Sequence, residues 1–228
     1  MDVEAGSFGH ETVVRREICE PIGSDMPIYF MLLDARLFDE RIYPALTESW
    51  RRRSFDPCRD LCSALTDACL AFQQTYHTGP AEPIVLQVAR GLPFDRHFWQ
   101  LLAGEIFLFA ASEIPEFQQA PDLFARLLVP DRIQLAAQDR RSFSPIQQAH
   151  YGSQDLKFGS KTYRPDHAGF NDREDVARLA AYLQRIDTSG WAMEDQEELE
   201  DARAWLPPLA DMYMRARDQD LIVLCEEL

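Results

Sequence analysis

Long apolar runs are missing from this chain. No stretch approaches the roughly 18 consecutive apolar residues that a membrane-spanning helix needs. The first six residues, Met-Asp-Val-Glu-Ala-Gly, are acidic and lack the basic and then apolar pattern of a signal peptide. These two absences predict a cytoplasmic protein.

Recognisable catalytic motifs are missing as well. The sequence has no dinucleotide-binding glycine fingerprint, no Ser-His-Asp or Cys-His catalytic motif and no regular series of metal ligands. We therefore expect no cofactor and no metal. Whether the protein is an enzyme stays open at this point.

Positive charge is scarce, and lysine is almost absent. Lys and Arg total 23 against 38 Asp and Glu, which gives a formal net charge of −15, and Lys157 and Lys161 are the only lysines. Nucleic acids and anionic membranes attract basic surfaces, so we expect neither as a partner. The charge suits a basic protein partner, although it also serves solubility. The excess of arginine over lysine is typical of a GC-rich bacterial genome.

The chain has five cysteines, an odd number, so free thiols are expected. Cys58, Cys62 and Cys69 recur at helical spacing and share one face of a predicted helix. A metal cluster with His77 is one interpretation, but zinc sites usually take cysteine pairs from turns at short spacing. We prefer burial in the core, where cysteine is common.

The pattern of apolar residues predicts a helix-dominated α+β fold. Its 228 residues, 46% hydrophobic and 27% charged, suffice for a real core. Short apolar runs at 27–33 and 221–225 predict two buried strands of one small sheet, covered by helices. We expect an N-terminal extension at 1–25 and a single domain at 26–228. Helices are predicted at 34–53 with an interruption at Pro44, at 58–76, 96–114 and 172–186, in short pieces between 115 and 137, and from about 193 with a break at Pro207-Pro208, while 83–89 is ambiguous.

Glu105 stands inside the most apolar predicted helix, which we expect to be central and apolar on nearly every side. A carboxylate in that position could act as a general acid with a raised pKa. The alternative is a structural carboxylate that pairs with an arginine or faces a solvent edge. We favour the alternative, because the sequence fixes no second titratable group beside Glu105.

The stretch from Phe143 to Asp172 mixes polar, aromatic and glycine residues without helical periodicity. We interpret it as a long loop that its aromatic residues pin to the body, and loops of this length are usually functional or disordered. It is not a phosphate loop, because it lacks the Walker spacing and a strand leading into it. Its lysines could hold an anionic group, and its other polar side chains could act as acids or bases. The candidate binding residues are His150, Tyr151, Lys157, Lys161, Tyr163 and His167.

Three segments resemble the YfbM-like family of bacterial proteins. They are Met26-Pro-Ile-Tyr-Phe30 followed by Asp34 and a helix; Gly159-Ser-Lys-Thr-Tyr163 leading to Asp172-Arg-Glu-Asp-Val176; and Leu209–Ala216 followed by Leu221–Leu224. They are similar to that family's opening strand and helix, its glycine-containing segment before a helix, and its final helix and strand. Residues 51–140 do not share the resemblance. The resemblance implies an α+β fold and no established activity, so it transfers no catalytic residue.

Two classes of function remain. The first is a protein-binding module, which could neutralise a basic partner such as a toxin; the acidic charge and the missing catalytic signature support it. The alternative is an enzyme acting on a small anionic substrate at the 143–172 loop. A deep pocket with convergent polar groups would favour the enzyme, and a flat acidic face would favour the binder. We favour the binding module.

Overall fold

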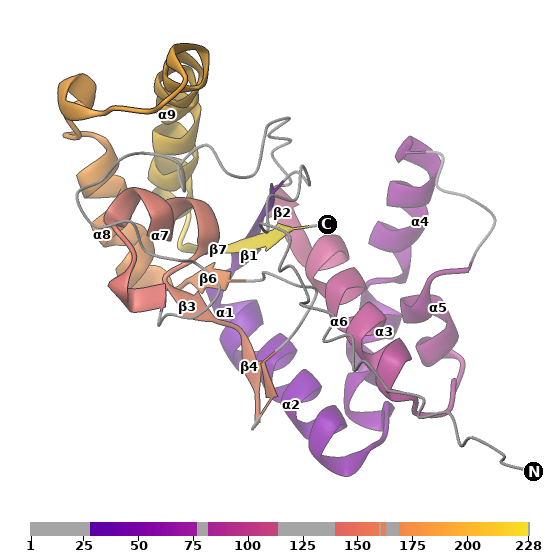
Figure 1. The fold of residues 1–228 in the computed structure, drawn as a ribbon. Helices are drawn as coiled ribbons and strands as arrows, with labels where there is room; N and C mark the ends of the chain where they lie inside the picture. The colour runs from indigo at the N-terminus through magenta and orange to yellow at the C-terminus, as the bar shows by residue number, and fades with distance from the viewer. Residues whose placement is uncertain (1–27, 77–81, 114–139, 160, 163–168, 228) are drawn as a thin grey trace, which may run out of the picture.

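The computed structural model describes residues 28–76, 82–113, 140–159, 161–162 and 169–227 (Figure 1). The expected extension at 1–25 and the short helices expected between 115 and 137 lie outside these residues. In chain order the elements are β1 (Ile28–Asp34), α1 (Ala35–Leu37), η1 (Phe38–Ile42), α2 (Tyr43–Arg52), η2 (Asp56–Cys58), α3 (Arg59–Ala64), α4 (Thr66–Tyr76), α5 (Ile84–Ala89), α6 (Arg96–Ala110), β2 (Ala111–Glu113), η4 (Arg140–Ser142), α7 (Pro145–Tyr151), β3 (Gln154–Asp155), β4 (Lys157–Phe158), β5 (Lys161–Thr162), β6 (Gly169–Asn171), α8 (Arg173–Leu183), η5 (Thr188–Gly190), α9 (Gln196–Asp218) and β7 (Leu221–Glu227).

A five-stranded antiparallel sheet with the order β2-β1-β7-β6-β3 lies at the centre. The two strands with the clearest sequence signal, β1 and β7, pair along their whole length, with Leu32 opposite Val223. This confirms the expectation that they share one sheet. The helix-dominated α+β fold is confirmed with it.

The sheet divides the apolar core into two clusters, because successive strand residues face opposite sides. Phe30 and Leu32 face the cluster built by α7, α8 and α9, whereas Met31 and Leu33 face the cluster built by α2, α3, α5 and α6. Figure 1 shows α7 to α9 on one side of the sheet and α3 to α6 on the other.

The first helical segment follows the prediction, with a local adjustment at Pro44. The Oδ1 atom of Asp34 accepts from the Leu37 N–H at 2.7 Å and so caps the helix. The helix then widens into one π turn, in which the Tyr43 N–H bonds to the Phe38 carbonyl. Because proline has no N–H to donate, the wider turn lets the chain continue through Pro44 instead of stopping there.

The helices predicted at 58–76 and 96–114 differ from the structure. The first is a short 3-10 turn followed by α3 and α4, which meet at Leu65. Helix α6 ends at Ala110, and the next three residues form β2 at the edge of the sheet. The helix was predicted to be central, and it packs against β1 on one side and against α4 and α5 on others. Trp99 and Phe107 are buried, but Leu101 is 44% exposed, so one side of the helix faces solvent.

Helix α9 runs without interruption through Pro207 and Pro208, so the predicted break is absent. Both prolines lie on its exposed face, where the carbonyl groups that lose a helical N–H partner can bond to water. The opposite face packs Leu206, Leu209 and Tyr213 into the core. Burial of that face outweighs the cost of the two prolines. None of the described helices is long and apolar enough to cross a membrane.

Candidate functional site

Helix α7 contributes the first residues of the site, at a place where the sequence predicted a loop. Ser144 and Gln147 form a capping box, in which the Gln147 N–H bonds to Ser144 Oγ and Gln147 Oε1 accepts from the Ser144 N–H at 3.1 Å. Pro145 occupies the first helical position, where proline is favoured. The Ser-Pro-Ile-Gln signature was therefore available in the sequence, but the segment is only seven residues long. The first third of the presumed loop is in fact a helix.

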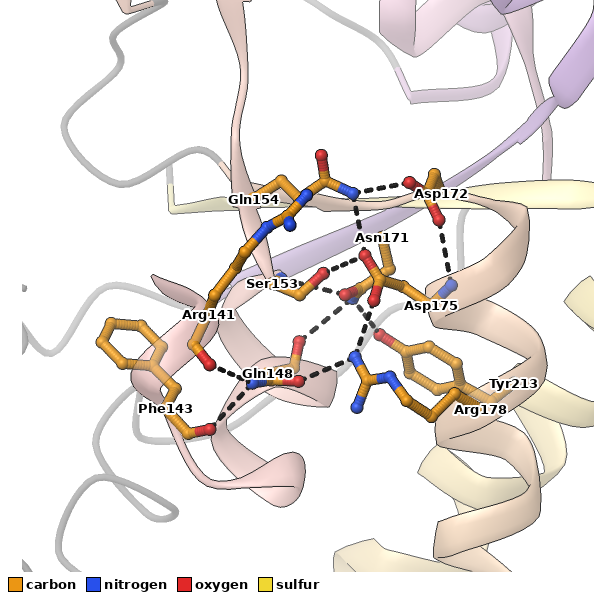
Figure 2. A network of polar contacts seen from close by, with 10 residues as sticks. All are labelled: Arg141, Phe143, Gln148, Ser153, Gln154, Asn171, Asp172, Asp175, Arg178 and Tyr213. Carbon is orange, nitrogen blue, oxygen red and sulfur yellow. Dashed lines mark hydrogen bonds and ion pairs between the residues drawn. The ribbon is translucent and has the colours of Figure 1, made fainter. Parts of the chain in front are cut away.

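A buried polar cluster joins α7 to α9 through β6. Tyr213 and Asn171 are both fully buried. The Tyr213 hydroxyl donates to the Ala149 carbonyl at 2.7 Å, and the Asn171 amide donates to that hydroxyl at 2.6 Å and to the Gln148 carbonyl at 3.0 Å. The Ser153 N–H completes the cluster by donating to Asn171 Oδ1 at 2.9 Å. These bonds fix α7, β6 and α9 relative to one another and so position the polar side chains of the site (Figure 2).

Asn171 directly precedes the helix predicted at 172–186, but it does not cap that helix. The cap of α8 is Asp172, whose Oδ1 atom accepts from the Asp175 N–H at 2.9 Å. Asn171 is instead the last residue of β6, and its side chain points into the core. The shift by one residue places Asp172 at the rim of the site.

Two carboxylates lie above the buried cluster. Gln154 Nε2 donates to Asp172 Oδ2 at 2.6 Å and to Asp175 Oδ2 at 2.8 Å, and the Ser153 hydroxyl donates to the same oxygen of Asp175. Arg178 Nη2 lies 2.6 Å from Asp175 Oδ1. Burial alone would raise the pKa of Asp175, but the bonds from Arg178, Ser153 and Gln154 outweigh it and hold that pKa below its ordinary value. Asp175 is therefore ionised at neutral pH.

Above these side chains is a polar cleft of about 360 Å³. That volume lies near the lower end of the roughly 300–1,000 Å³ that is typical of ligand sites. The side chains converge from α7, the segment before it, β3 and the first two turns of α8. The lining residues are Arg141, Gln148, Ser153, Gln154, Asp172, Glu174, Asp175 and Arg178.

The arrangement suits binding better than acid-base catalysis. A general base works best with a pKa near the operating pH, and the pKa of Asp175 is shifted the other way. The hydroxyl of Ser153 is bonded to a carboxylate, and among the described residues no histidine lines the cleft to activate it. The cleft offers fixed charges and hydrogen-bonding groups.

Two of the predicted binding residues, His150 and Tyr151, lie inside the protein. Both belong to α7 and are buried. The ring of His150 packs edge-on against Phe30 at 5.8 Å and against Tyr151 at 4.6 Å between ring centroids. Their side chains therefore contribute packing on the α7–α9 side of the sheet.

The lysines lie elsewhere, on the small β4–β5 hairpin. Lys157 pairs with Thr162 and Lys161 with Phe158, so the two lysines are not cross-strand neighbours. The side chain of Lys157 is exposed, with its Nζ atom 3.7 Å from Asp155 Oδ2. Phe158 belongs to the core cluster on the opposite side of the sheet from His150 and Tyr151. Tyr163 and His167 lie outside the described residues.

Glu105 has a structural position. Its Oε1 and Oε2 atoms accept from the N–H groups of Ile84 and Val85 at 3.0 and 2.7 Å. These are the first two amides of α5, so Glu105 caps that helix from a distance, because Pro83 at the cap position has no side chain acceptor. Burial raises the pKa of Glu105, and the two amides partly oppose the shift. The expected arginine partner is replaced by backbone N–H groups.

The described cysteines are buried and free, as expected for Cys58, Cys62 and Cys69. Burial raises the pKa of the Cys58 and Cys62 thiols to about 12, so they are protonated and unreactive at neutral pH. Within the described ranges, no three His, Cys, Asp or Glu side chains are placed to hold a metal ion.

No family model, curated protein or solved structure matches the chain.

Proposed function

We propose that this chain is a protein-binding module, and that its polar cleft receives a positively charged side chain of a basic partner. The observation that supports the proposal is the charge of the cleft, whose described lining has three carboxylates, Asp172, Glu174 and Asp175, against two guanidinium groups, Arg141 and Arg178. The uncharged donors are consumed within the network, whereas the carboxylates keep unused lone pairs. A ligand that brings positive charge and donors is therefore favoured.

The amide and hydroxyl donors of the cleft are already bonded. Gln148 Nε2 donates to the carbonyl groups of Arg141 and Phe143, and Gln154 Nε2 donates to the two aspartates, so both amide groups have spent their two hydrogens. The Ser153 hydroxyl has spent its hydrogen on Asp175.

The lone pairs of the carboxylates are only partly used. An ionised carboxylate offers about four lone-pair sites. Asp172 uses two of them, for Gln154 and for the helix cap, and Asp175 uses three. Glu174 is exposed and has no hydrogen-bond or ion-pair partner in the described part of the chain. Arg178 pairs with Asp175 and Arg141 also lines the cleft, so the two arginines leave one carboxylate charge in excess, which suits an ammonium or guanidinium group.

The net charge of −15 supports the same partner class, since it would draw a basic protein towards the cleft from a distance. A basic toxin of the bacterial cytoplasm is one partner of this kind. Membership of the YfbM-like family is part of the proposal and rests on the three resembling segments alone. The alternative, an enzyme for small anionic substrates, has less support, because the carboxylates that line the cleft outnumber the arginines.

The test compares two pairs of substitutions at equivalent helix positions. Asp172 and Glu174 are the N-cap and second residues of α8, and Asp195 and Glu197 are the N-cap and second residues of α9. The cleft variant carries Asp172→Asn and Glu174→Gln, and the control variant carries Asp195→Asn and Glu197→Gln. Each variant removes two negative charges and keeps an asparagine that can cap its helix. Binding of a fluorescent peptide of alternating arginine and glycine is measured by anisotropy, with a glutamate peptide for comparison.

The cleft variant should bind the arginine peptide about 10- to 100-fold more weakly than wild type, as expected for the loss of charge-assisted hydrogen bonds. The α9 variant should stay within about threefold, the effect of general charge. Equal losses in the two variants would show attraction by net charge only and contradict a specific cleft. Tighter binding of the glutamate peptide would favour the anionic-substrate alternative.

A further inference from the structure

Arginine gathers at one place on the far side of the sheet from the cleft. Residues 41–59 contain five arginines and two carboxylates, in a chain whose net charge is −15. Most of these arginines are neutralised locally. Arg51 and Arg52 both bond to Glu48, and Arg59 Nη2 lies 2.7 Å from Asp56 Oδ1.

Two guanidinium groups beside Trp50 have no carboxylate partner among the described residues. Arg53 and Arg96 form no ion pair or hydrogen bond through their side chains in the described part of the chain. Both lie over the indole of Trp50, each with its Cζ atom 5.9 Å from the ring centroid. They come from different elements, since Arg53 follows the end of α2 and Arg96 begins α6. The fold thus brings to one aromatic ring two positive charges that no described carboxylate pairs with.

The ring is held in place. Trp50 packs against Trp99 with 5.0 Å between ring centroids, and Trp99 in turn packs edge-on against Phe158 at 5.3 Å. Trp99 and Phe158 are buried in the core. The two guanidinium groups therefore rest on a fixed support.

The backbone at Arg53 is unusual for a residue with a long side chain. Arg53 has φ 52° and ψ 49°, the left-handed conformation that closes α2. Glycine is the residue that usually occupies this position, because it has no Cβ to clash. Arginine keeps the same turn under strain, and its side chain supplies the charge over Trp50 that glycine would lack.

The neighbouring carboxylate does not cancel these charges. Asp95 precedes Arg96, but its Oδ1 atom accepts from the N–H groups of His97 and Phe98 at 2.7 and 3.2 Å. Asp95 thus caps α6 and forms no ion pair with either arginine. Two guanidinium groups that the same ring attracts repel one another, and a bound anion would relieve this repulsion.

We propose that Arg53 and Arg96, supported on Trp50, form a binding site for a phosphate monoester. Guanidinium groups present paired N–H donors that match phosphate oxygens, and they stack on aromatic rings while doing so. The site is separate from the acidic cleft, and it would give the protein a ligand of opposite charge to the proposed partner.

Calorimetric titration of the full chain with inorganic phosphate and with phenyl phosphate, at constant ionic strength, tests the site. Arg53→Gln and Arg96→Gln should each weaken both ligands at least about 10-fold, as loss of a charge-assisted contact requires. Arg59→Gln removes the same charge from a paired arginine and should change the affinity less than about twofold. Equal weakening by all three variants, or no binding by wild type at millimolar ligand, would overturn the proposal. An ester that fails to displace phosphate would overturn the monoester assignment.

A second variant separates binding from folding. Arg53→Gly relieves the left-handed strain, so its Tm should equal or exceed that of wild type. Its affinity for phosphate should nevertheless fall as far as that of Arg53→Gln. A glycine variant that keeps full affinity would show that the Arg53 side chain does not contact the ligand.

Discussion

Removing the buried hydroxyl of Tyr213 tests the polar cluster on which the candidate site is built. In Tyr213→Phe the ring stays in the core and only the oxygen is lost. That oxygen donates to the Ala149 carbonyl at 2.7 Å and accepts from the Asn171 amide at 2.6 Å. Ala149 lies in the last turn of α7, where carbonyl groups have no helical partner, so its oxygen would lose this bond without replacement.

The expected loss of stability comes from polar groups that stay buried without a hydrogen-bond partner. One carbonyl oxygen and one amide hydrogen would each lose a partner, and an unsatisfied buried polar group costs about 1–3 kcal/mol. The Asn171 amide keeps its second bond, to the Gln148 carbonyl, which limits the loss. We therefore expect Tyr213→Phe to lower the free energy of unfolding by about 2–4 kcal/mol.

Urea unfolding followed by far-UV circular dichroism measures this difference. The matched control is Tyr182→Phe, which removes a hydroxyl from a half-buried tyrosine and should change the free energy by less than about 0.5 kcal/mol. Combining Tyr213→Phe with Asn171→Ala should cost less than the sum of the two single variants, because they share one bond. Equal effects of the two tyrosine variants would refute the account of the cluster.

Three further outcomes are expected. Glu105→Ala should lower the free energy of unfolding by about 2–4 kcal/mol, because the first two amides of α5 lose their acceptors. Gly169→Ala should also destabilise the protein in urea, since an added Cβ would overlap the carbonyl oxygen of the last residue of α7. Asp175→Asn should destabilise at neutral pH, and its difference from wild type should shrink as the pH falls below about 4, because stability that depends on a lowered carboxyl pKa is lost on protonation.

Each outcome has a control of the same chemistry. Glu200→Ala changes an exposed helical glutamate, and Gly190→Ala adds a Cβ where no atom lies within 4 Å. Asp211→Asn changes an exposed aspartate of α9. If a control destabilised the protein as much as the variant that it matches, or if the effect of Asp175→Asn grew on acidification, the corresponding argument would fail.

The sequence predicted the fold correctly where a segment carries one clear pattern of apolar residues. The β1 and β7 strands are short uniform apolar runs, and the helix before β7 has a clear apolar face. Asp34 and Asp95 stand at the starts of predicted helices, where aspartate is favoured as a cap, and both accept backbone N–H bonds. Local signals of this kind do not depend on the rest of the structure.

The candidate site was harder to predict, because its residues are brought together by tertiary packing. Gln148 comes from a short helix, Ser153 from the bend before β3 and Asp175 from a second helix, and no fixed spacing joins them. The lysines and histidines of the same stretch have chemistry that is conspicuous in a sequence, but they do not mark the cleft. The structure shows that His150 is a packing residue, while an ordinary glutamine two positions earlier lines the cleft.

The two proposed sites lie on opposite sides of the central sheet, and this arrangement has a consequence. The acidic cleft is formed by α7, β3 and α8, on the side of the sheet where α7, α8 and α9 pack. The arginine site is formed by α2 and α6, which pack on the other side. Opposite charges held close together would neutralise one another, as Arg178 and Asp175 do at 2.6 Å. Separation by the sheet keeps both sets of charges available, and at ordinary salt each is screened from the other beyond a Debye length of roughly 10 Å. Substitutions at the two sites should therefore be additive in their effects on binding, and the cleft variant should bind phosphate as wild type does.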